Sequence, residues 1–373
     1  PADGVRRLTV GYENNGQAYG AVDLGDRFGA TDDWGVRFNA VLRDGETAVE
    51  DQDRSLSVFS LGTDYAGERF RFSADLGYQD NRIDAPRPQV TPLAGVPAEP
   101  DADTNFAQPW TYTDEEQLFG VVRGEYDLSD NISVWLGAGA RKGEEANVLA
   151  NPSAAQDGSL TAYRFDNTRE DDVISFDTGL SAEFMTGSIG HRVVVSASSV
   201  KLESKNAYAF SSFFAPFATD LYRPVDVAPP AADFFIGGDL ASPLKTEEVT
   251  NQSLAIADTL SFLDGRLLAT IGLRQQDIET KTFDYTSGQR LSGYSDDKLT
   301  PAFGLVYKAT DEISVYGNYA ESLQPGEIAP ATSGGVTIIN AGEVLEPFTG
   351  DQYEIGAKYD GGDVGATIAL FQL

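Results

Sequence analysis

The feature that most constrains this chain is an alternation of apolar and polar side chains with a period of two residues. It is clear at 34–43, 69–79 and 352–360, and it recurs less cleanly elsewhere. Because successive side chains of a strand point to opposite faces of a sheet, each segment predicts a strand with one apolar and one polar face. We expect the apolar face to carry Val36, Phe38, Phe70, Phe72, Leu76, Tyr353 and Ile355. We expect the polar face to carry Arg37, Arg71, Asp75, Glu354 and Lys358.

The connections between these segments are the second constraint. We count about 15 segments, many of them longer than the usual strand of about 5 to 6 residues. Seven connections are short and polar, at 29–33, 66–68, 128–131, 186–188, 263–265, 309–312 and 360–363. Longer connections alternate with them, at 45–52, 81–113, 144–170, 204–245, 281–295 and 323–349. The first connection, near Asn14, is short although it falls on the long side.

This rhythm predicts an all-β protein built as an antiparallel up-and-down meander, with its short turns at one end. Transmembrane β-barrels have this layout, with short periplasmic turns and long extracellular loops. In a barrel of that kind the apolar face of each strand would point outward to lipid. A soluble propeller or stacked sandwich is the alternative, but a propeller needs a motif that recurs roughly every 40 to 50 residues. The chain shows no such repeat.

Composition excludes several classes of function. Lys plus Arg is 27 and Asp plus Glu is 58, which gives a net charge of −31 and argues against binding nucleic acid. The chain has no cysteine and a single histidine, His191, so thiolate metal sites and cysteine or histidine catalysis are not expected. The adjacent carboxylates Glu247 and Glu248 would face opposite sides of a strand. We therefore expect no enzyme, no catalytic residue, no bound metal and no cofactor.

Three stretches resemble a known family. AIADTLSFLDGRLLATIGLRQQDI at 255–278 and LTPAFGLVYKATDEISVYGNYAESLQPG at 299–326 resemble two consecutive hairpins of TonB-dependent siderophore receptors. NAGEVLEPFTGDQYEIGAKYD at 340–360 resembles the segment that follows them in that family. The ferric-hydroxamate branch is the most similar. The other strands match only in rhythm.

The resemblance implies an outer-membrane barrel of 22 strands in a Gram-negative cell, plugged by an N-terminal domain. It implies uptake of ferric siderophores, energised by TonB through a short N-terminal box. The siderophore would be transported cargo, and lipid or lipopolysaccharide would surround the barrel. About 15 of the expected 22 strands are present, so we expect 1–373 to be a partial barrel domain without the plug and the last strands. Its sheet should then be open, with free edges near 5–13 and 364–373.

Two other functions stay open at this point. One is a TonB-dependent transporter of another scarce solute, such as a glycan, cobalamin or haem. The other is a diffusion porin without a plug. A plug domain upstream of Pro1 would separate the second from the others.

The long connection at 204–245 is the best candidate for a ligand site, because eight aromatic residues fall within about 30 residues of loop. It supplies the candidates Tyr208, Phe210, Phe213, Phe214, Tyr222 and Arg223. The connection at 81–113 adds Phe106, Trp110 and Tyr112. These residues could form an aromatic vestibule that holds a siderophore. Equally, they could pack against each other as a small core over the barrel mouth.

Overall fold

The structure is all-β and consists of one long meander. The computed structural model describes residues 4–326, 329–343 and 345–373. Within these residues 15 long strands follow one another: β1 (Val5–Tyr12), β2 (Ala18–Phe28), β3 (Trp34–Glu46), β4 (Asp53–Ala66), β5 (Phe70–Asp84), β7 (Tyr112–Ser129), β8 (Ile132–Ala154), β9 (Ser159–Thr186), β10 (Ile189–Phe210), β13 (Lys245–Phe262), β14 (Leu267–Phe283), β15 (Arg290–Lys308), β16 (Ile313–Gln324), β19 (Phe348–Asp360) and β20 (Gly365–Gln372). Each pairs antiparallel with the next.

Short elements lie in the connections. They are the 3-10 turn η1 (Asn14–Gly16), β6 (Thr91–Pro92), β11 (Phe217–Asp220), β12 (Phe235–Gly237), β17 (Thr332–Ser333) and β18 (Val336–Thr337). No helix in the described part of the chain is long and apolar enough to cross a membrane.

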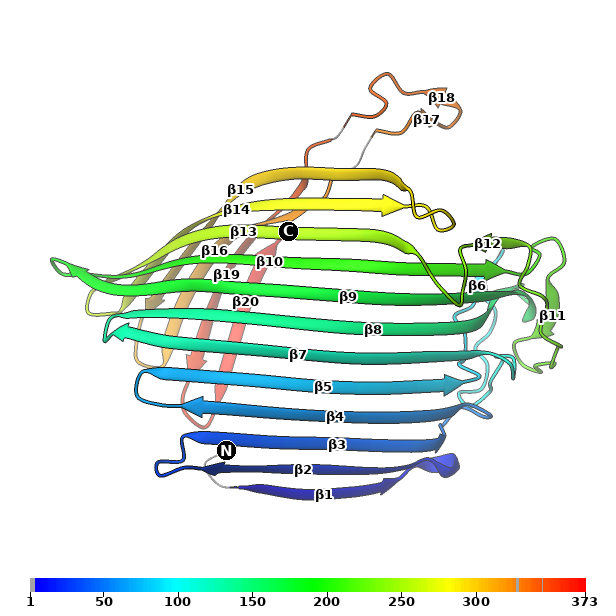
Figure 1. Cartoon of the computed structure of the whole chain (residues 1–373), viewed down its shortest axis with the longest axis horizontal. Coiled ribbons are helices and arrows are strands. Elements are labelled where there is room, and N and C mark those ends of the chain that lie inside the picture. Colours follow the sequence, from blue (N-terminus) through cyan, green and yellow to red (C-terminus); the bar gives the residue numbers. More distant parts are fainter. Residues whose placement is uncertain (1–3, 327–328, 344) are drawn as a thin grey trace.

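The predicted sidedness is confirmed. Because consecutive long strands are antiparallel neighbours, alternate connections lie at opposite ends of the sheet. The seven short turns all fall at one end, and the longer connections fall at the other (Figure 1). In membrane barrels, the end with the short turns is the periplasmic end and the end with the long loops is the extracellular end.

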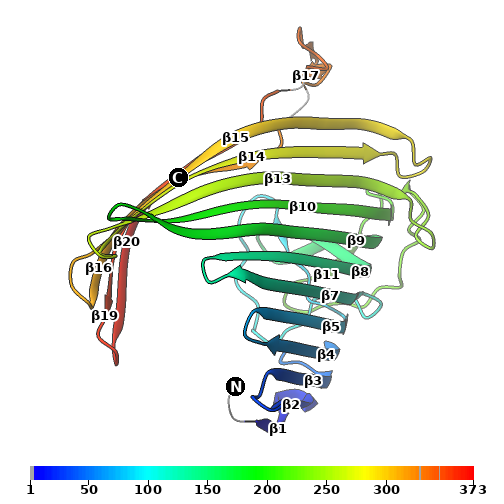
Figure 2. The ribbon, with the colours of Figure 1, turned by 60° about the vertical axis from the view of Figure 1, so that its left-hand side comes forward.

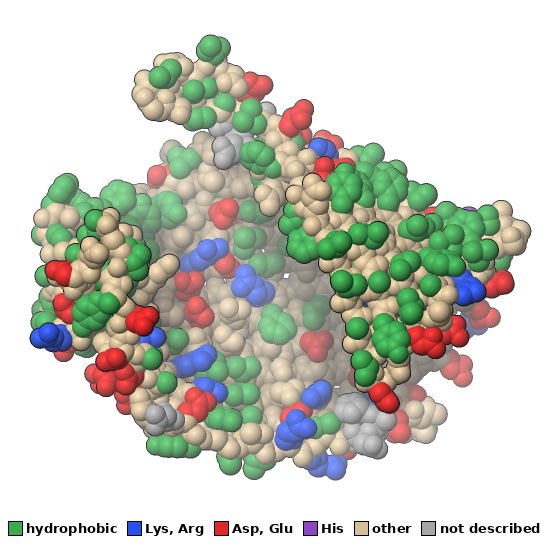
Figure 3. Space-filling model, turned by 180° about the vertical axis from the view of Figure 1, so that it is seen from behind, with side chains coloured by type: hydrophobic (Ala, Val, Ile, Leu, Met, Phe, Trp, Pro, Cys, Tyr) green, Lys and Arg blue, Asp and Glu red, His purple; other side chains and the backbone are tan. Residues whose placement is uncertain are grey.

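The predicted faces are also confirmed by the strand register. Phe38 pairs with Leu61 and Leu61 with Leu76, so these three side chains share one face, and Leu76 is 51% exposed on it. On the opposite face Arg71 binds Asp127 with both guanidinium nitrogens, at 2.7 and 2.8 Å. Figure 3 looks into the hollow on this inner side, where acidic and basic side chains gather.

The apolar part of the outer face forms a belt of limited height. On β9 it runs from Phe184 to Ile174, which at the usual strand rise and tilt spans roughly 25 Å, the thickness of a hydrocarbon layer. Charged residues begin directly above it, with Asp172 on β9, Lys142 on β8 and Lys201 on β10. The strand β9 then continues to Ser159, roughly 35 to 40 Å above the belt.

The sheet is open, as the odd strand count predicts. Among the described residues β1 pairs only with β2, and β20 pairs only with β19. Figure 2 shows the sheet curved, with β1 and β20 at its two free margins.

Two predicted connections are too long. In 281–295 only residues 284–289 lie between β14 and β15. Most of 144–170 is strand, because β8 and β9 continue as a hairpin and turn only between Ala154 and Ser159. The lower outer face of this hairpin carries ion pairs, such as Lys142 with Glu144 and Lys205 of β10 with Glu170, in place of apolar side chains. The apolar alternation therefore disappears from the sequence although the backbone pairing continues. We call the part of β8 and β9 above Asp172, with its turn, the tower.

Candidate functional site

Aromatic rings cover the inner side of the tower. Tyr163 and Phe165 are alternate residues of β9, and Tyr208 and Phe210 are alternate residues of β10. Because Phe210 pairs with Phe165, all four side chains point to the inner side. The ring centroids of Phe165 and Phe210 are 4.6 Å apart. Two paired strands thus present an aromatic wall at the end of the sheet that carries the long connections.

The loops beyond β10 add further rings to this wall. Phe213 lies 5.0 Å from Tyr163 and 5.3 Å from Phe210 between ring centroids. Tyr208 contacts Phe235 of β12 and Tyr285, which follows β14. The rings are packed on one another and yet accessible, since Phe213 is 43% and Phe235 is 52% exposed. We define the ring cluster as Tyr163, Phe165, Tyr208, Phe210, Phe213, Phe234, Phe235 and Tyr285.

A cavity of about 440 Å³ adjoins the ring cluster at Tyr163. Its floor is the inner side of β8 near Asn151 and Ser153, and its wall is the loop that follows β5. Arg87 and Gln89 of that loop line it, and Arg87 is held by a hydrogen bond of 2.8 Å from its Nη1 to the carbonyl oxygen of Ala102. Arg87 is the one charged residue of this lining.

Below the rings, amide side chains cross the inner wall. Thr113, Asn147, Asn167 and Asn206 come from β7, β8, β9 and β10 and are joined by hydrogen bonds. Next to them Arg169 donates to Asp171 at 2.9 Å, and this contact raises the pKa of the Arg169 guanidinium. The inner side therefore passes from aromatic rings through neutral amides to paired charges.

The predicted site residues separate into two groups. Tyr208, Phe210 and Phe213 belong to the ring cluster, and Phe214, which is 87% exposed, contacts it through Phe234. The second group packs elsewhere. Phe106 lies with Ala154, Leu160 and Leu221 in a small buried core on the outer side of the tower.

The other members of the second group hold loops together or face outward. The indole nitrogen of Trp110 donates to the carbonyl oxygen of Val227 at 2.9 Å. The hydroxyl of Tyr222 donates to the carbonyl oxygen of Ala98, and its ring covers Gly158. Gly158 has φ +91, and an added Cβ would lie 2.1 Å from that ring, so the tower turn needs glycine here.

Arg223 and Tyr112 also lie away from the rings. Arg223 is exposed, and its backbone nitrogen donates to Asp220. Tyr112 lies on the outer side, under the guanidinium of Arg82. Sequence reasoning missed Tyr163, Phe165, Phe234, Phe235 and Tyr285 as site residues. The alternation Tyr163-Arg164-Phe165-Asp166 was the signal that could have revealed the first two.

The inner wall at membrane height carries a chain of ion pairs. Arg71 binds Glu125 and Asp127, and Arg123 binds Glu125 and Asp177. The indole nitrogen of Trp135 donates to Asp177 at 2.6 Å. Two guanidinium groups thus pair with three carboxylates across β5, β7 and β9, so this polar surface suits contact with water or with a polar protein domain.

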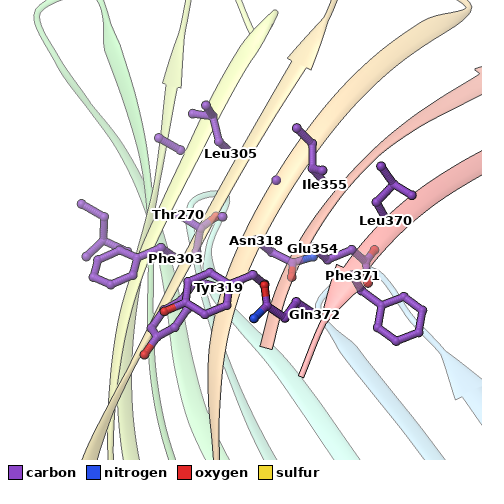
Figure 4. Close-up of a pocket in the computed structure, with 15 residues that line it drawn as sticks. Thr270, Phe303, Leu305, Asn318, Tyr319, Glu354, Ile355, Leu370, Phe371 and Gln372 are labelled. Carbon is purple, nitrogen blue, oxygen red and sulfur yellow. The ribbon is translucent and has the colours of Figure 1, made fainter. Parts of the chain in front are cut away.

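One groove lies on the outer face and does not serve as a ligand site. It measures about 740 Å³ and lies on the outer face of β14, β15, β16, β19 and β20. Phe303, Leu305, Tyr319, Ile355 and Leu370 line it (Figure 4). Their positions in the apolar belt put this groove against hydrocarbon. In the described residues no group of three or more His, Asp or Glu side chains could hold a metal ion.

Comparison with known proteins gives a consistent result. Residues 3–373 match the family model described as TonB dependent receptor-like, beta-barrel. The ferrichrome receptor FcuA of Yersinia enterocolitica is 35% identical over 375 residues, which is 99% of this chain and 48% of the relative. The chain thus spans about half the length of that relative.

Solved structures agree. The ferric preacinetobactin receptor BauA of Acinetobacter baumannii superposes with a TM-score of 0.88 at 31% identity, over 100% of this chain and 54% of that one. The siderophore receptor PiuA of the same species superposes with a TM-score of 0.78 at 18% identity, covering 99% and 57% of the two chains, and supports the fold alone.

Proposed function

This chain belongs to the TonB-dependent receptor-like β-barrel family, and on that premise we propose that it is part of the barrel of an outer-membrane receptor for ferric siderophores. The relatives named above bind ferrichrome and ferric preacinetobactin by their names, which supports transport of an iron chelate and not catalysis. In the structure, the observation that carries the proposal is the ring cluster with its adjoining cavity on the inner side of the tower. A bulky chelate would contact the rings and fill the cavity.

The cavity suits a neutral or anionic chelate. Arg87 is its one charged residue, although the chain as a whole carries a net charge of −31. A cationic complex would meet the fixed positive charge of Arg87. We include Tyr208, Phe210, Phe213 and Tyr163 in the ligand surface and leave out Phe106, Trp110, Tyr112 and Tyr222, which have structural contacts of their own.

The outer face supports placement in an outer membrane. Five of the eight lysines, Lys142, Lys201, Lys205, Lys245 and Lys281, lie on the outer face directly above the apolar belt. They interleave with carboxylates, and Glu248 binds three of them at 3.0 to 3.3 Å. At this height we propose contact with the phosphorylated headgroups of lipopolysaccharide, with divalent cations bridging the carboxylates to phosphate.

The remaining partners follow from the family. We propose that an N-terminal plug of the full-length protein fills the hollow and contacts the ion pairs around Arg71 and Arg123. Further strands would pair with the free edges of β1 and β20 and close the barrel, because unpaired backbone groups are costly in lipid. TonB would supply energy through a box preceding the plug.

Growth under iron starvation tests the proposal. The full-length gene would be expressed in a strain that lacks its own ferric-siderophore receptors, with ferrichrome as the iron source. We expect growth with the wild type and a loss of at least tenfold in ferrichrome uptake for Phe210→Ala, because Phe210 contacts five other rings.

The matched control is Phe59→Ala, which truncates the same residue type on the outer face. It should leave uptake within twofold of the wild type. Failure of the wild type to take up any of a neutral trihydroxamate, a catecholate or a citrate complex of iron would refute the proposed function.

A further inference from the structure

Four polar side chains form one hydrogen-bonded row across the inner wall. The hydroxyl of Thr113 donates to Oδ1 of Asn147 at 2.5 Å. Nδ2 of Asn147 donates to Oδ1 of Asn167 at 2.7 Å, and Nδ2 of Asn167 donates to Oδ1 of Asn206 at 3.2 Å. The row thus joins four neighbouring strands, β7, β8, β9 and β10, and we call it the amide row.

The direction of the amide row is fixed by one carboxylate. Nδ2 of Asn147 also donates to Glu145, which stands two residues before it on the same face. An ionised carboxylate accepts hydrogen bonds and cannot donate them, so the Nδ2 side of Asn147 must face Glu145 and its neighbour Asn167. Glu145 therefore fixes which end of the Asn147 amide is oxygen and which is nitrogen.

The orientation of Asn147 also fixes which way the amides of Asn167 and Asn206 are turned. Asn167 must offer its oxygen to Asn147, so its nitrogen faces Asn206. Asn206 must in turn accept with its oxygen, which leaves its own Nδ2 group at the end of the row. Within the described chain, no hydrogen bond from this Nδ2 is found, and it is not among the buried unpaired atoms. The amide row therefore ends in an accessible donor.

This donor lies on the inner side of β10, next to the ring cluster. Asn206 stands two residues before Tyr208 on the same face of β10, directly below the ring cluster. Asn167, its partner, lies seven residues above Ile174, the last apolar residue of the belt on β9, which is roughly 18 Å along the membrane normal. A ligand resting on the rings would therefore reach Asn206 from the extracellular side.

We propose that Asn206 determines ligand specificity by donating a hydrogen bond to an oxygen acceptor on the bound ferric chelate. This inference rests on the proposed function and adds the polar half of the site. The rings contact the apolar part of the chelate, and Nδ2 of Asn206 bonds a carbonyl or iron-bound oxygen at its edge. Each donor in the row polarises the next, so the terminal donor is a better one than an isolated amide.

Replacement of one atom tests the inference. Asn206→Asp keeps the shape of the side chain and the oxygen that accepts from Asn167. It replaces the Nδ2 donor, which would bond the ligand, with a second oxygen acceptor. We expect ferrichrome to bind the full-length receptor roughly 10- to 100-fold more weakly than it binds the wild type, with unchanged thermal unfolding. Asn206→Ala should weaken binding less, because it removes the donor without introducing a repulsive charge.

A second variant tests whether Glu145 orients the amide row. Glu145→Gln can donate as well as accept, so the amides are free to turn over and the Asn206 donor is lost in part. We expect a loss of roughly two- to tenfold in affinity. Phe59→Ala, which lies on the outer face and outside the amide row, should bind ferrichrome within twofold of the wild type.

Binding would be measured by quenching of tryptophan fluorescence in purified full-length receptor, with ferrichrome, ferrioxamine B, a ferric tris-catecholate and ferric citrate as probes. Weaker binding of the wild type's preferred probe by Asn206→Asp supports the inference. Equal affinity of Asn206→Asp and wild type overturns it and leaves the proposed function standing. If the wild type binds none of the four probes, the proposed function fails and this inference fails with it.

Discussion

Leu136 offers the sharpest test of the membrane placement. Its side chain is at the centre of the apolar residues that β8 presents outward, between Val134 and Ala138, and it is 63% exposed. Its cross-strand partners are Gly124 and Thr178, so no large neighbour shields it. In a soluble protein such a residue would face water, and Leu136→Arg would be nearly neutral or stabilising.

In a membrane the same substitution is costly. An arginine on the lipid face of a barrel at the bilayer midplane costs about 2 to 4 kcal/mol, and the cost falls to about 0 to 1 kcal/mol near the interface. The first range corresponds to a loss of roughly 30- to 700-fold in the folding equilibrium constant, at about 1.4 kcal/mol for each factor of ten. Ala146 provides the matched control. It lies on the same face ten residues further along β8, which places it roughly 25 Å higher and outside the hydrocarbon.

Urea titration of the full-length protein in phospholipid vesicles measures both variants. We expect Leu136→Arg to lower the free energy of unfolding by about 2 to 4 kcal/mol and Ala146→Arg to lower it by at most about 1 kcal/mol. Equal effects of the two substitutions, or a gain of stability for Leu136→Arg, would refute the assignment of the outer face to lipid.

Two further predictions concern the inner wall and the loops. Gly179→Ala should lower the free energy of unfolding by about 1 to 3 kcal/mol and shift the tryptophan emission. An added Cβ would lie 2.2 Å from the Trp135 ring and would break the hydrogen bond from Trp135 to Asp177. Gly124→Ala is the control and should be neutral, because its Cβ would meet Phe70 at an ordinary 3.7 Å. The turn after β14 should loosen in acid, because hydrogen bonds from the Ser287 backbone and hydroxyl lower the pKa of Asp284 below its usual 3.8. This contribution is complete above pH 3.8 or so and is lost as the pH falls through the lowered pKa, so amide exchange at Thr286 and Ser287 should accelerate there in the wild type and not in Asp284→Asn.

The strands and their faces could be read from the sequence because the signals are local. Alternation such as that of Phe70, Phe72 and Leu76 arises from one strand and needs no knowledge of its neighbours. The short turns are equally local, since residues such as Asp32 at φ 56 and Gly187 at φ 63 adopt the left-handed backbone that Asp and Gly tolerate. A meander converts this local information directly into topology, because each strand pairs with the next.

The tower and the amide row depend on register between strands, and no local pattern reveals register. Lys205 and Glu170 are separated by 35 residues, yet their ion pair of 2.8 Å replaces the apolar contacts that mark a strand lower down. Asn147, Asn167 and Asn206 are likewise ordinary polar residues until the pairing of β8, β9 and β10 aligns them. The aromatic candidates could be found from composition, but the face on which each lies could not.

The small packed core that one interpretation of the aromatic loops predicted lies on the outer side of the tower, whereas the rings on the inner side stay partly exposed. On the outer side Phe106, Leu160 and Leu221 form a buried core. Gln108, 1% exposed, fastens one long loop to the other by accepting from the backbone nitrogen of Val227 at 2.8 Å and donating to the carbonyl oxygen of Val225 at 3.0 Å. These contacts join segments 117 and 119 residues apart and hold the loops against the tower. The loops that carry the inner rings are held by these contacts on the outer side of the tower. The rings can therefore stay partly exposed without the loops folding over them. If the proposed ligand binds there, this anchored surface loses little conformational entropy on binding.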